Sequence, residues 1–295
     1  MAVVVLVVHE DRPEAVAQAD VLATALVADG HRVDRSDNPD FVSSGVDDAT
    51  DLVVSLGGDG SILRAINLLD GRTAPVLGVN HGELGYLTTV EPVEAHAAVS
   101  RVLAGHYDLE ERMMLRVEMY RSNEGTSEMV GYALNEVVVE RGAGSQTVRV
   151  AVSLDGEPFT SYAADGLIAA TPTGSTAYAF SARGPIVDPL HRAIQLTPVS
   201  PHMLFDRTLV LDPSTEVGME VLGRRAATCT VDGRSVANLK GGDRVVCTAA
   251  ERVAHLVTFT PRDLRGLLVT PQSRLRLERF IDSRLERGPF FLRLP

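Results

Sequence analysis

The first third of the chain alternates apolar runs with segments of helical spacing. Val3–Val8 is a continuous β-branched run, as expected of a buried parallel strand. Asp11, Pro13 and Glu14 follow it and predict a helix start with a capping box, and helical spacing then continues up to Gly30. The alternation continues with strands expected at 31–35, 52–56 and 76–79 and helices at 61–69 and 92–103. This pattern predicts an N-terminal α/β domain over 1–107.

The pattern changes near residue 108, where helical spacing largely ends. Period-two segments predict strands at 115–120, 134–140, 148–154 and 209–211. The pairs Asp155-Gly156 and Asp232-Gly233 each stand between strand-like runs and predict two-residue hairpin turns. We therefore expect a β-rich second domain over 108–260. The tail over 261–295 carries many arginines and no firm pattern, and we expect it to be solvated or to return to the N-terminal domain; these arginines include Arg274, Arg276, Arg279, Arg284 and Arg287.

Composition and charge narrow the class of protein. Of the 295 residues, 45% are hydrophobic and 23% are charged, which is typical of a globular protein. The formal net charge of -11 disfavours nucleic acid and anionic membranes as partners. No stretch approaches the roughly 20 apolar residues of a membrane span, and the N-terminus lacks a basic leader, so we expect a cytoplasmic location. Cys229 and Cys247 are too few for a disulfide framework and are expected to be buried thiols.

A glycine-rich loop, Gly57-Gly58-Asp59-Gly60-Ser61, stands where an apolar strand ends and a helix begins. Glycines let a phosphate approach backbone N–H groups closely, and the start of a helix adds positive dipole. The carboxylate of Asp59 would repel a phosphate unless it holds a cation or accepts a proton from an attacking hydroxyl. Asp59 is therefore a candidate general base. The alternative is a tight turn in which Asp59 only caps the helix.

A second segment, 165–178, runs from a strand into a loop dense in small hydroxyl residues. Thr173, Ser175 and Thr176 offer neutral donors that suit a phosphate or a ribose, and Tyr178 offers a flat surface for a base. The alternative is a surface turn rich in Ser and Thr.

A third candidate is the polar pair Asn135-Glu136, which interrupts the predicted strand 134–139. Together these side chains could hold two adjacent sugar hydroxyls, although at least one of them is expected to face water on an alternating strand. Other templates are missing: the sequence has no GxxxxGK[ST] loop, no HExxH and no GxSxG, and the glycine loop lacks the third glycine of a dinucleotide fingerprint. His81 is expected to be a loop residue and is left outside the catalytic set.

The four segments occur together in an order that resembles the NAD kinase family, over roughly residues 50–240. They are GGDGS at 57–61, NHGELGYL at 80–87, Asn135-Glu136, and DGLIAATPTGSTAYAFSARGP at 165–185. GGDG also marks phosphofructokinases and lipid kinases, whereas TPTGSTAY is characteristic of NAD kinases. The resemblance implies a Rossmann-like α/β domain of the phosphofructokinase/diacylglycerol kinase-like type and a C-terminal β-rich domain, with the nucleotide between them. It also implies a homodimer or homotetramer paired through the β-rich domains.

The resemblance implies an activity and roles for individual residues. The reaction is transfer of the γ-phosphoryl group of ATP, or a phosphoryl group of polyphosphate, to the 2′-hydroxyl of the adenosine ribose of NAD, with Mg²⁺ or another divalent metal. By position, Asp59 resembles the proton acceptor, Gly60 its ligand-contacting neighbour and Arg64 a phosphate contact. Asn135 and Glu136 resemble the ribose-binding pair. Asp165 matches a residue that reaches the nicotinamide half, and the segment that holds the adenosine half matches Thr173, Thr176, Ala177, Tyr178, Ala179, Phe180 and Ser181.

The chain departs from the usual family pattern at a few positions. Ser61 stands where a threonine is usual, Arg183 stands where a glycine is usual, and Arg234 stands where many members have glutamine. Ala163 is a small residue at a position that, in the family, accompanies use of NADH beside NAD, so we hypothesise that both dinucleotides are accepted. Two other functions stay open: another GGDG-type kinase acting on a lipid or sugar, and a dinucleotide-binding regulator that has lost catalysis.

Overall fold

The computed structural model describes residues 1–259 except 39–40, 42–45, 83–85, 123–126, 143–146 and 204. The middle of the NHGELGYL motif and the arginine-rich tail that was expected to return to the N-terminal domain both lie outside the described residues. None of the described helices is long and apolar enough to cross a membrane.

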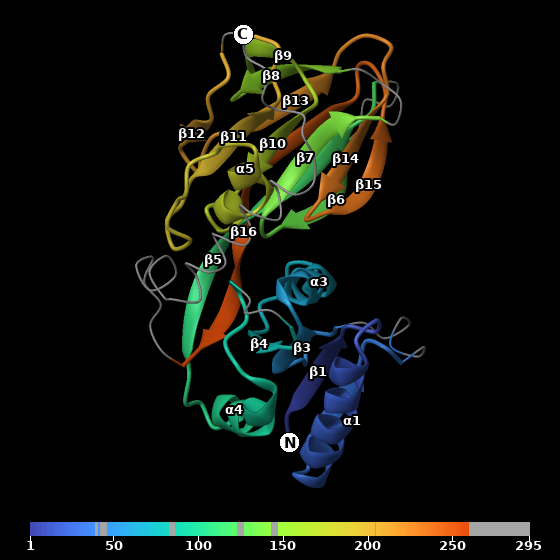
Figure 1. Ribbon diagram of the computed structural model, residues 1–295, viewed down its shortest axis with the longest axis vertical. Helices are drawn as coiled ribbons and strands as arrows, with labels where there is room; N and C mark the ends of the chain where they lie inside the picture. The colour runs from blue at the N-terminus through green and yellow to red at the C-terminus, as the bar shows by residue number, and fades with distance from the viewer. Residues whose placement is uncertain are drawn as a thin grey trace, which may run out of the picture.

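The N-terminal part is a parallel sheet with helices on both faces, and its elements confirm the predicted alternation (Figure 1). Four parallel strands lie in the order β2-β1-β3-β4. The elements are β1 (Val3–Val8), α1 (Pro13–Ala28), β2 (Arg32–Arg35), β3 (Leu52–Gly57), α3 (Asp59–Leu69), β4 (Val76–Asn80), a 3-10 turn (Pro92–Glu94) and α4 (Ala95–Leu103). Helices α1 and α4 pack on one face of this sheet and α3 packs on the other.

The capping box predicted for α1 is wrong. The N-cap is Arg12, which makes no side-chain capping bond, and Pro13 is the first helical residue. Proline suits that position because it has no backbone N–H that would need a partner. The guanidinium group of Arg12 instead donates to the carbonyl oxygen of His81, and this contact ties the start of α1 to the segment after β4.

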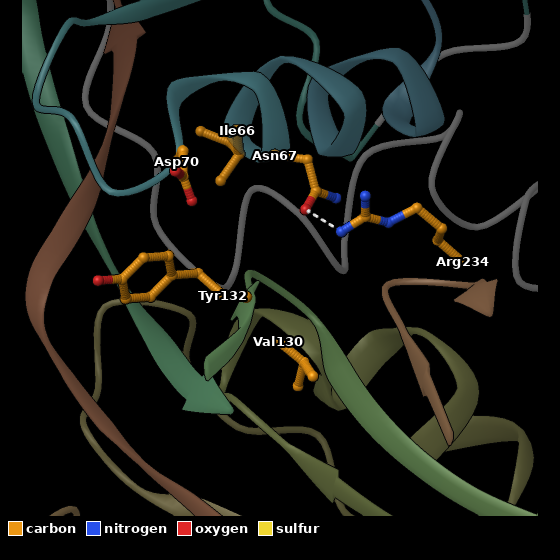
Figure 2. A pocket seen from close by; sticks show the side chains of 7 residues that line it. Ile66, Asn67, Asp70, Val130, Tyr132 and Arg234 are labelled. Carbon is orange, nitrogen blue, oxygen red and sulfur yellow. Dashed lines mark hydrogen bonds between the residues drawn. The ribbon is translucent and has the colours of Figure 1, made fainter. Parts of the chain in front are cut away.

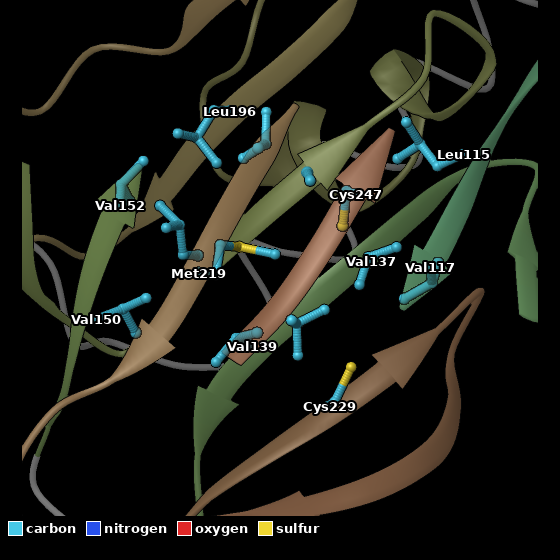
Figure 3. Packing of buried hydrophobic residues seen from close by; sticks show 14 of the residues in the cluster. Leu115, Val117, Val137, Val139, Val150, Val152, Leu196, Met219, Cys229 and Cys247 are labelled. Carbon is cyan, nitrogen blue, oxygen red and sulfur yellow. The ribbon is translucent and has the colours of Figure 1, made fainter. Parts of the chain in front are cut away.

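The remaining elements are mostly strands, which confirms the predicted β-rich part, and they form a β sandwich. They are β5 (Asp108–Tyr120), β6 (Ser127–Ala133), β7 (Glu136–Arg141), β8 (Val148–Leu154), β9 (Glu157–Ala164), β10 (Gly166–Ala170), a 3-10 turn (Thr173–Thr176), α5 (Tyr178–Ser181), β11 (Ile194–Val199), β12 (Leu209–Leu211), β13 (Val217–Val221), β14 (Ala227–Val231), β15 (Arg234–Leu239) and β16 (Arg244–Thr258). One sheet has the order β12-β11-β10-β7-β14-β15, and the other contains β5, β6, β8, β9, β13 and β16. Their facing sides enclose an apolar core that includes Val137, Val150, Leu196 and Met219 (Figure 3).

Both predicted hairpin turns are present. Asp155-Gly156 and Asp232-Gly233 join neighbouring antiparallel strands, and all four residues have positive φ, as a type I′ turn requires. Cys229 and Cys247 are buried free thiols in the sandwich core, as expected, and burial raises the pKa of Cys229 to about 12.

The two parts are joined through β5 and β16, which are long strands paired with each other in antiparallel fashion (Figure 1). Near its end, β16 also pairs in parallel with β4, at Leu256 and Val76, so the N-terminal sheet continues into one sheet of the sandwich. An apolar cluster at this junction includes Ile62 and Ala65 of α3 together with Leu134. This cluster brings α3 against the chain just before β7.

Candidate active site

Asp59 is the first residue of α3, at the carboxyl end of the buried strand β3. Its two carboxylate oxygens accept hydrogen bonds from the backbone N–H groups of Tyr86 (2.8 Å) and Leu87 (2.9 Å). The N-cap of the helix is Gly58, which has no side chain to form a cap. The alternative in which Asp59 only caps its own helix is therefore wrong: the carboxylate holds a second loop at the helix start.

The glycines of this loop have different structural roles. A Cβ atom at Gly57 would clash with Ser61 Oγ, so packing demands glycine there. A Cβ atom at Gly58 or Gly60 would meet no atom within 4 Å. The backbone at these two positions is therefore open, beside the positive end of the α3 dipole, which is the arrangement that favours an anion.

Asn135 and Glu136 lie at the start of β7, and the prediction that they interrupt a strand is wrong. Asn135 lies in a bend before the strand, and Glu136 is its first residue. The carboxylate of Asp232 fixes this bend by accepting backbone N–H groups from Leu134 (2.7 Å), Asn135 (2.8 Å) and Glu136 (3.0 Å). A β strand needs its backbone N–H groups for bonds to neighbouring strands. It therefore cannot continue through residues whose N–H groups all bond to the side chain of Asp232.

Glu136 is only 8% exposed, and one of its carboxyl oxygens has no hydrogen-bond partner. Burial, with a smaller contribution from the charge of Asp232, raises its pKa to about 8. The backbone amide of Tyr178 makes a hydrogen bond to this carboxyl group. Glu136 is therefore a neutral carboxylic acid near pH 7 that contacts the segment carrying Tyr178.

The hydroxyl-rich segment is buried, so the alternative of a surface turn is wrong. Thr171, Thr173 and Ser175 are each at most 2% exposed. Thr171 Oγ1 donates to the carbonyl oxygen of Leu134 and accepts the N–H of Gly174 (3.1 Å). A Cβ atom at Gly174 would clash with the carbonyl oxygen of Asn135. These contacts hold the TGST turn directly against the Asn135-Glu136 bend.

Arg64 and Asp165 lie apart from that bend. Arg64 donates to the carbonyl oxygen of Val8 (3.2 Å) and to Glu10 Oε1 (3.1 Å), at the carboxyl end of β1. Asp165 pairs with Arg141 (3.1 Å). Asp165 precedes β10, and Ala170 at the other end of β10 is in register with Glu136. The length of this strand therefore places the backbone of Asp165 about 16 Å from that of Glu136 within one chain.

The amino-acid sequence matches models and members of a known enzyme family. The sequence model of the ATP-NAD kinase N-terminal domain matches residues 8–107, and that of the ATP-NAD kinase C-terminal domain matches residues 134–259. An NAD kinase of Heliobacterium modesticaldum is 41% identical over 74% of this chain and 77% of its own length. The chain belongs to the NAD kinase family.

Solved NAD kinase structures share the fold. The structure of an NAD kinase from Archaeoglobus fulgidus in complex with ATP has 26% sequence identity and a TM-score of 0.69, covering 92% of this chain and 98% of that one. Yeast NADH kinase complexed with NADH has 24% identity and a TM-score of 0.82, covering 100% and 90% of the two chains, and this likeness concerns the fold alone. The predicted fold class of an α/β domain followed by a β-rich domain is confirmed.

The structure gives a physical setting to the departures from the family pattern. Arg183 has φ of 68°, in the left-handed region that glycine enters without cost and other residues enter with strain. Ser61 is buried, and its Oγ atom fills the space where Gly57 lacks a side chain. Arg234 is the first residue of β15 and donates to Asn67 on α3 (3.2 Å).

Two residues of this candidate site were not found by sequence reasoning. Asp232 was assigned only to a hairpin turn, yet its carboxylate organises the Asn135-Glu136 bend. Arg112 was not singled out at all. Its guanidinium group is 1% exposed, pairs with Glu110 and reaches Thr173 Oγ1 (3.4 Å). Arg112 follows Glu110 and Glu111 in the charged start of β5, so no local signal in the sequence marked its side chain as buried.

Proposed function

We propose that this chain is an NAD kinase that transfers the γ-phosphoryl group of ATP to the 2′-hydroxyl of the adenosine ribose of NAD, giving NADP. The observation that carries the proposal is the junction between the two parts of the chain. Asp59 starts α3, and Leu134, next to Asn135 and Glu136, packs in the same apolar cluster as Ile62 of that helix. A candidate base and a candidate sugar-binding pair thus lie on segments that meet in one apolar cluster.

Asp59 would act as the general base. A ribose hydroxyl is a poor nucleophile, and a carboxylate at hydrogen-bond distance takes its proton as the new P–O bond forms and the bond to the leaving ADP breaks. The open backbone at Gly58 and Gly60 and the N-terminus of α3 would stabilise the charge on the transferring phosphoryl group. Arg64, on the same helix, would contact phosphate by leaving its present partner Glu10.

Asn135 and Glu136 would orient the ribose. A neutral carboxylic acid has one donor and can also accept, and an amide does both, so together they match two adjacent hydroxyl groups. The unpaired, buried oxygen of Glu136 supports this role. The adenosine half would lie against the segment from Thr173 to Ser181, which is held to the same bend. We extend the proposal to Asp165 as a contact of the nicotinamide half.

The divalent metal is expected to enter with the nucleotide. Among the described residues no group of three or more His, Cys, Asp or Glu side chains could hold a metal ion. This fits Mg²⁺, which is commonly held by one or two carboxylates together with substrate phosphates. When bound, it neutralises charge on the phosphates, and Asp59 is the carboxylate of the glycine loop that would face it.

We also propose that two copies pair through the β sandwich into a homodimer, or into a homotetramer. Each sheet of the sandwich ends in an edge strand that carries exposed apolar side chains: Phe159 on β9 is 43% exposed and Val210 on β12 is 54% exposed. Such edges favour association. Sedimentation velocity of the full chain would show the dimer or tetramer, and a monomer at micromolar concentration would contradict this part.

The test of the function is NADP formation from NAD with ATP and Mg²⁺. Parallel reactions replace ATP by polyphosphate and NAD by NADH, because the donor and the redox state of the acceptor are separate questions. We expect turnover with ATP, and with NADH as well as NAD if the small Ala163 sets selectivity. Absence of any phosphorylated product with either donor, while calorimetry still detects NAD binding, would favour the non-catalytic regulator instead.

A further inference from the structure

Arg234 links the two halves of the candidate site. It stands two residues after Asp232, whose carboxylate fixes the Asn135-Glu136 bend. Its own guanidinium group donates to Asn67 Oδ1 on α3 (3.2 Å), across 167 positions of sequence (Figure 2). Asn67 lies on the helix that begins at Asp59, about 12 Å further along the axis. A continuous chain of contacts thus runs from the candidate base to the candidate ribose pair.

A cavity lies beside the hydrogen bond between Arg234 and Asn67, and it shows how this bond can affect the orientation of α3. A cavity of about 300 Å³ separates the C-terminal half of α3 from β6, and Asn67, Tyr132 and Arg234 are among its lining residues (Figure 2). The apolar face of α3 is packed along its length, through Ile62, Ala65, Ile66 and Leu69, in the cluster that contains Leu134. Apolar packing is non-directional. Such packing holds the buried face of the helix in place but does not by itself fix its rotation about its own axis, and a directional contact beside the cavity does.

On the other side of this cavity, separate contacts hold the loop that follows α3. A Cβ atom at Gly71 would lie 2.8 Å from the ring of Tyr132, so the loop after α3 packs closely on β6. Arg252 on β16 also donates to the carbonyl oxygen of Gly71 (2.6 Å). The hydrogen bond from Arg234 to Asn67 is the second polar contact beside this cavity, and the two contacts together define the orientation of the helix.

We infer that Arg234 is a positioning residue: through Asn67 it sets the orientation of α3, and hence of Asp59, relative to the ribose pair. The inference rests on the proposed function. All the proposed dinucleotide contacts other than the glycine loop and Arg64 lie in the β sandwich, where Asp232 still holds the Asn135-Glu136 bend if Arg234 is removed. Loss of the link should therefore impair the chemical step and leave dinucleotide binding largely intact, since a small misplacement of a base is costly.

The test is a double-mutant cycle of Arg234→Ala and Asn67→Ala, with Arg234→Lys as the conservative variant. We expect each alanine variant to lower kcat by about 3- to 10-fold, as loss of one hydrogen bond allows, with KM for NAD changed less than about 2-fold. The double variant should be no worse than either single variant. Arg234→Lys keeps a donor and should recover part of kcat. Arg224→Ala is the matched control, because it removes an exposed arginine from the same domain.

A second readout separates this inference from the proposed function. Hydrogen exchange of the α3 amides should be faster in Arg234→Ala than in the parent protein and unchanged in Arg224→Ala. This measurement requires no turnover, so a parent protein without kinase activity would contradict the proposed function and leave the link testable. Unchanged kcat in Arg234→Ala, or independent and additive losses in the cycle, would overturn the positioning role.

Discussion

Glu136 is a carboxyl group that the fold holds in its protonated form near neutral pH. Burial raises its pKa to about 8, well above the ordinary value of 4.5. The folded protein therefore keeps a proton that the unfolded chain releases between these two values. By linkage, the stabilisation from this proton is complete below about pH 4.5 and is lost as the pH rises through about 8.

We predict that Glu136→Gln removes this pH dependence, since glutamine stays neutral at every pH. Between pH 5 and 8 the free energy of unfolding of the parent protein should fall relative to the variant, by no more than about 1.4 kcal/mol per pH unit. Urea denaturation of both proteins at several pH values measures the difference. Parallel curves over that range would show that Glu136 is ionised in the folded protein.

Arg183 offers a second test at a single position. Its φ of 68° costs an L-residue roughly 1–2 kcal/mol, of which the greater flexibility of unfolded glycine offsets about 0.5–1 kcal/mol. Arg183→Gly should therefore raise the free energy of unfolding by about 0.5–1 kcal/mol. Arg183→Ala is the control, because it removes the long cation and keeps the Cβ atom. Equal stability of these two variants would contradict the backbone explanation.

Single residues also show where sequence reasoning reached its limit. Asp59 was recognisable because a carboxylate repels phosphate, so its presence in a phosphate-type loop points to a role in binding a cation or accepting a proton. Asp232 was not recognisable, because an Asp-Gly turn already accounts for an aspartate at that position. Nothing local indicates that its carboxylate also binds the Asn135-Glu136 bend. The elevated pKa of Glu136 depends on three segments that converge only in the folded chain, so no local pattern carries it.

At the scale of elements, apolar runs predicted most strands and helices well, because burial decides their positions. The errors lie where a polar contact competes with a local signal. Arg12, engaged with His81, replaces Asp11 as the N-cap of α1. Asn135 is outside β7 because its backbone N–H binds Asp232. Such contacts join residues far apart in sequence, which a local pattern cannot show.

The turn between β3 and α3 gives a prediction at this scale. In Gly57→Ala the new Cβ atom meets Ser61 Oγ, and we expect overpacking to cost about 1–3 kcal/mol of stability. Gly60→Ala meets no atom within 4 Å and lies inside a helix, so its stability should be equal or greater. Thermal unfolding of the two variants compares them directly. Similar melting temperatures would show that Gly57 is not constrained by packing.

At the scale of the whole molecule, the two parts share structure and should unfold together. Strand β16 pairs with β5 and β13 in the sandwich and with β4 in the N-terminal sheet, and one apolar cluster joins α3 to Leu134. The change from helical to strand spacing near residue 108 was visible in the sequence, but the pairing of Leu256 with Val76 was not, because such distant pairing has no local signature.

We therefore predict a single cooperative transition on heating, with a calorimetric enthalpy close to the van't Hoff enthalpy of the cooperative unit. Leu134→Ala should lower the stability of that whole unit by about 2–5 kcal/mol, since Leu134 is fully buried in the shared cluster. Differential scanning calorimetry of both proteins is the measurement. Two separate transitions in the parent protein, with only one shifted in the variant, would show that the parts unfold independently.

The measurement that tests the central claim most directly is the rate of NADP formation by Asp59→Asn beside the parent protein, with ATP and Mg²⁺. Asparagine keeps the shape and one acceptor for the loop at Tyr86 and Leu87, but it cannot take a proton. Asp108→Asn, which changes an exposed aspartate at the start of β5, serves as the control. We expect kcat to fall by about 10²-fold or more in Asp59→Asn, with NAD binding retained. Turnover equal to that of the parent protein would contradict the assignment of Asp59 as the base.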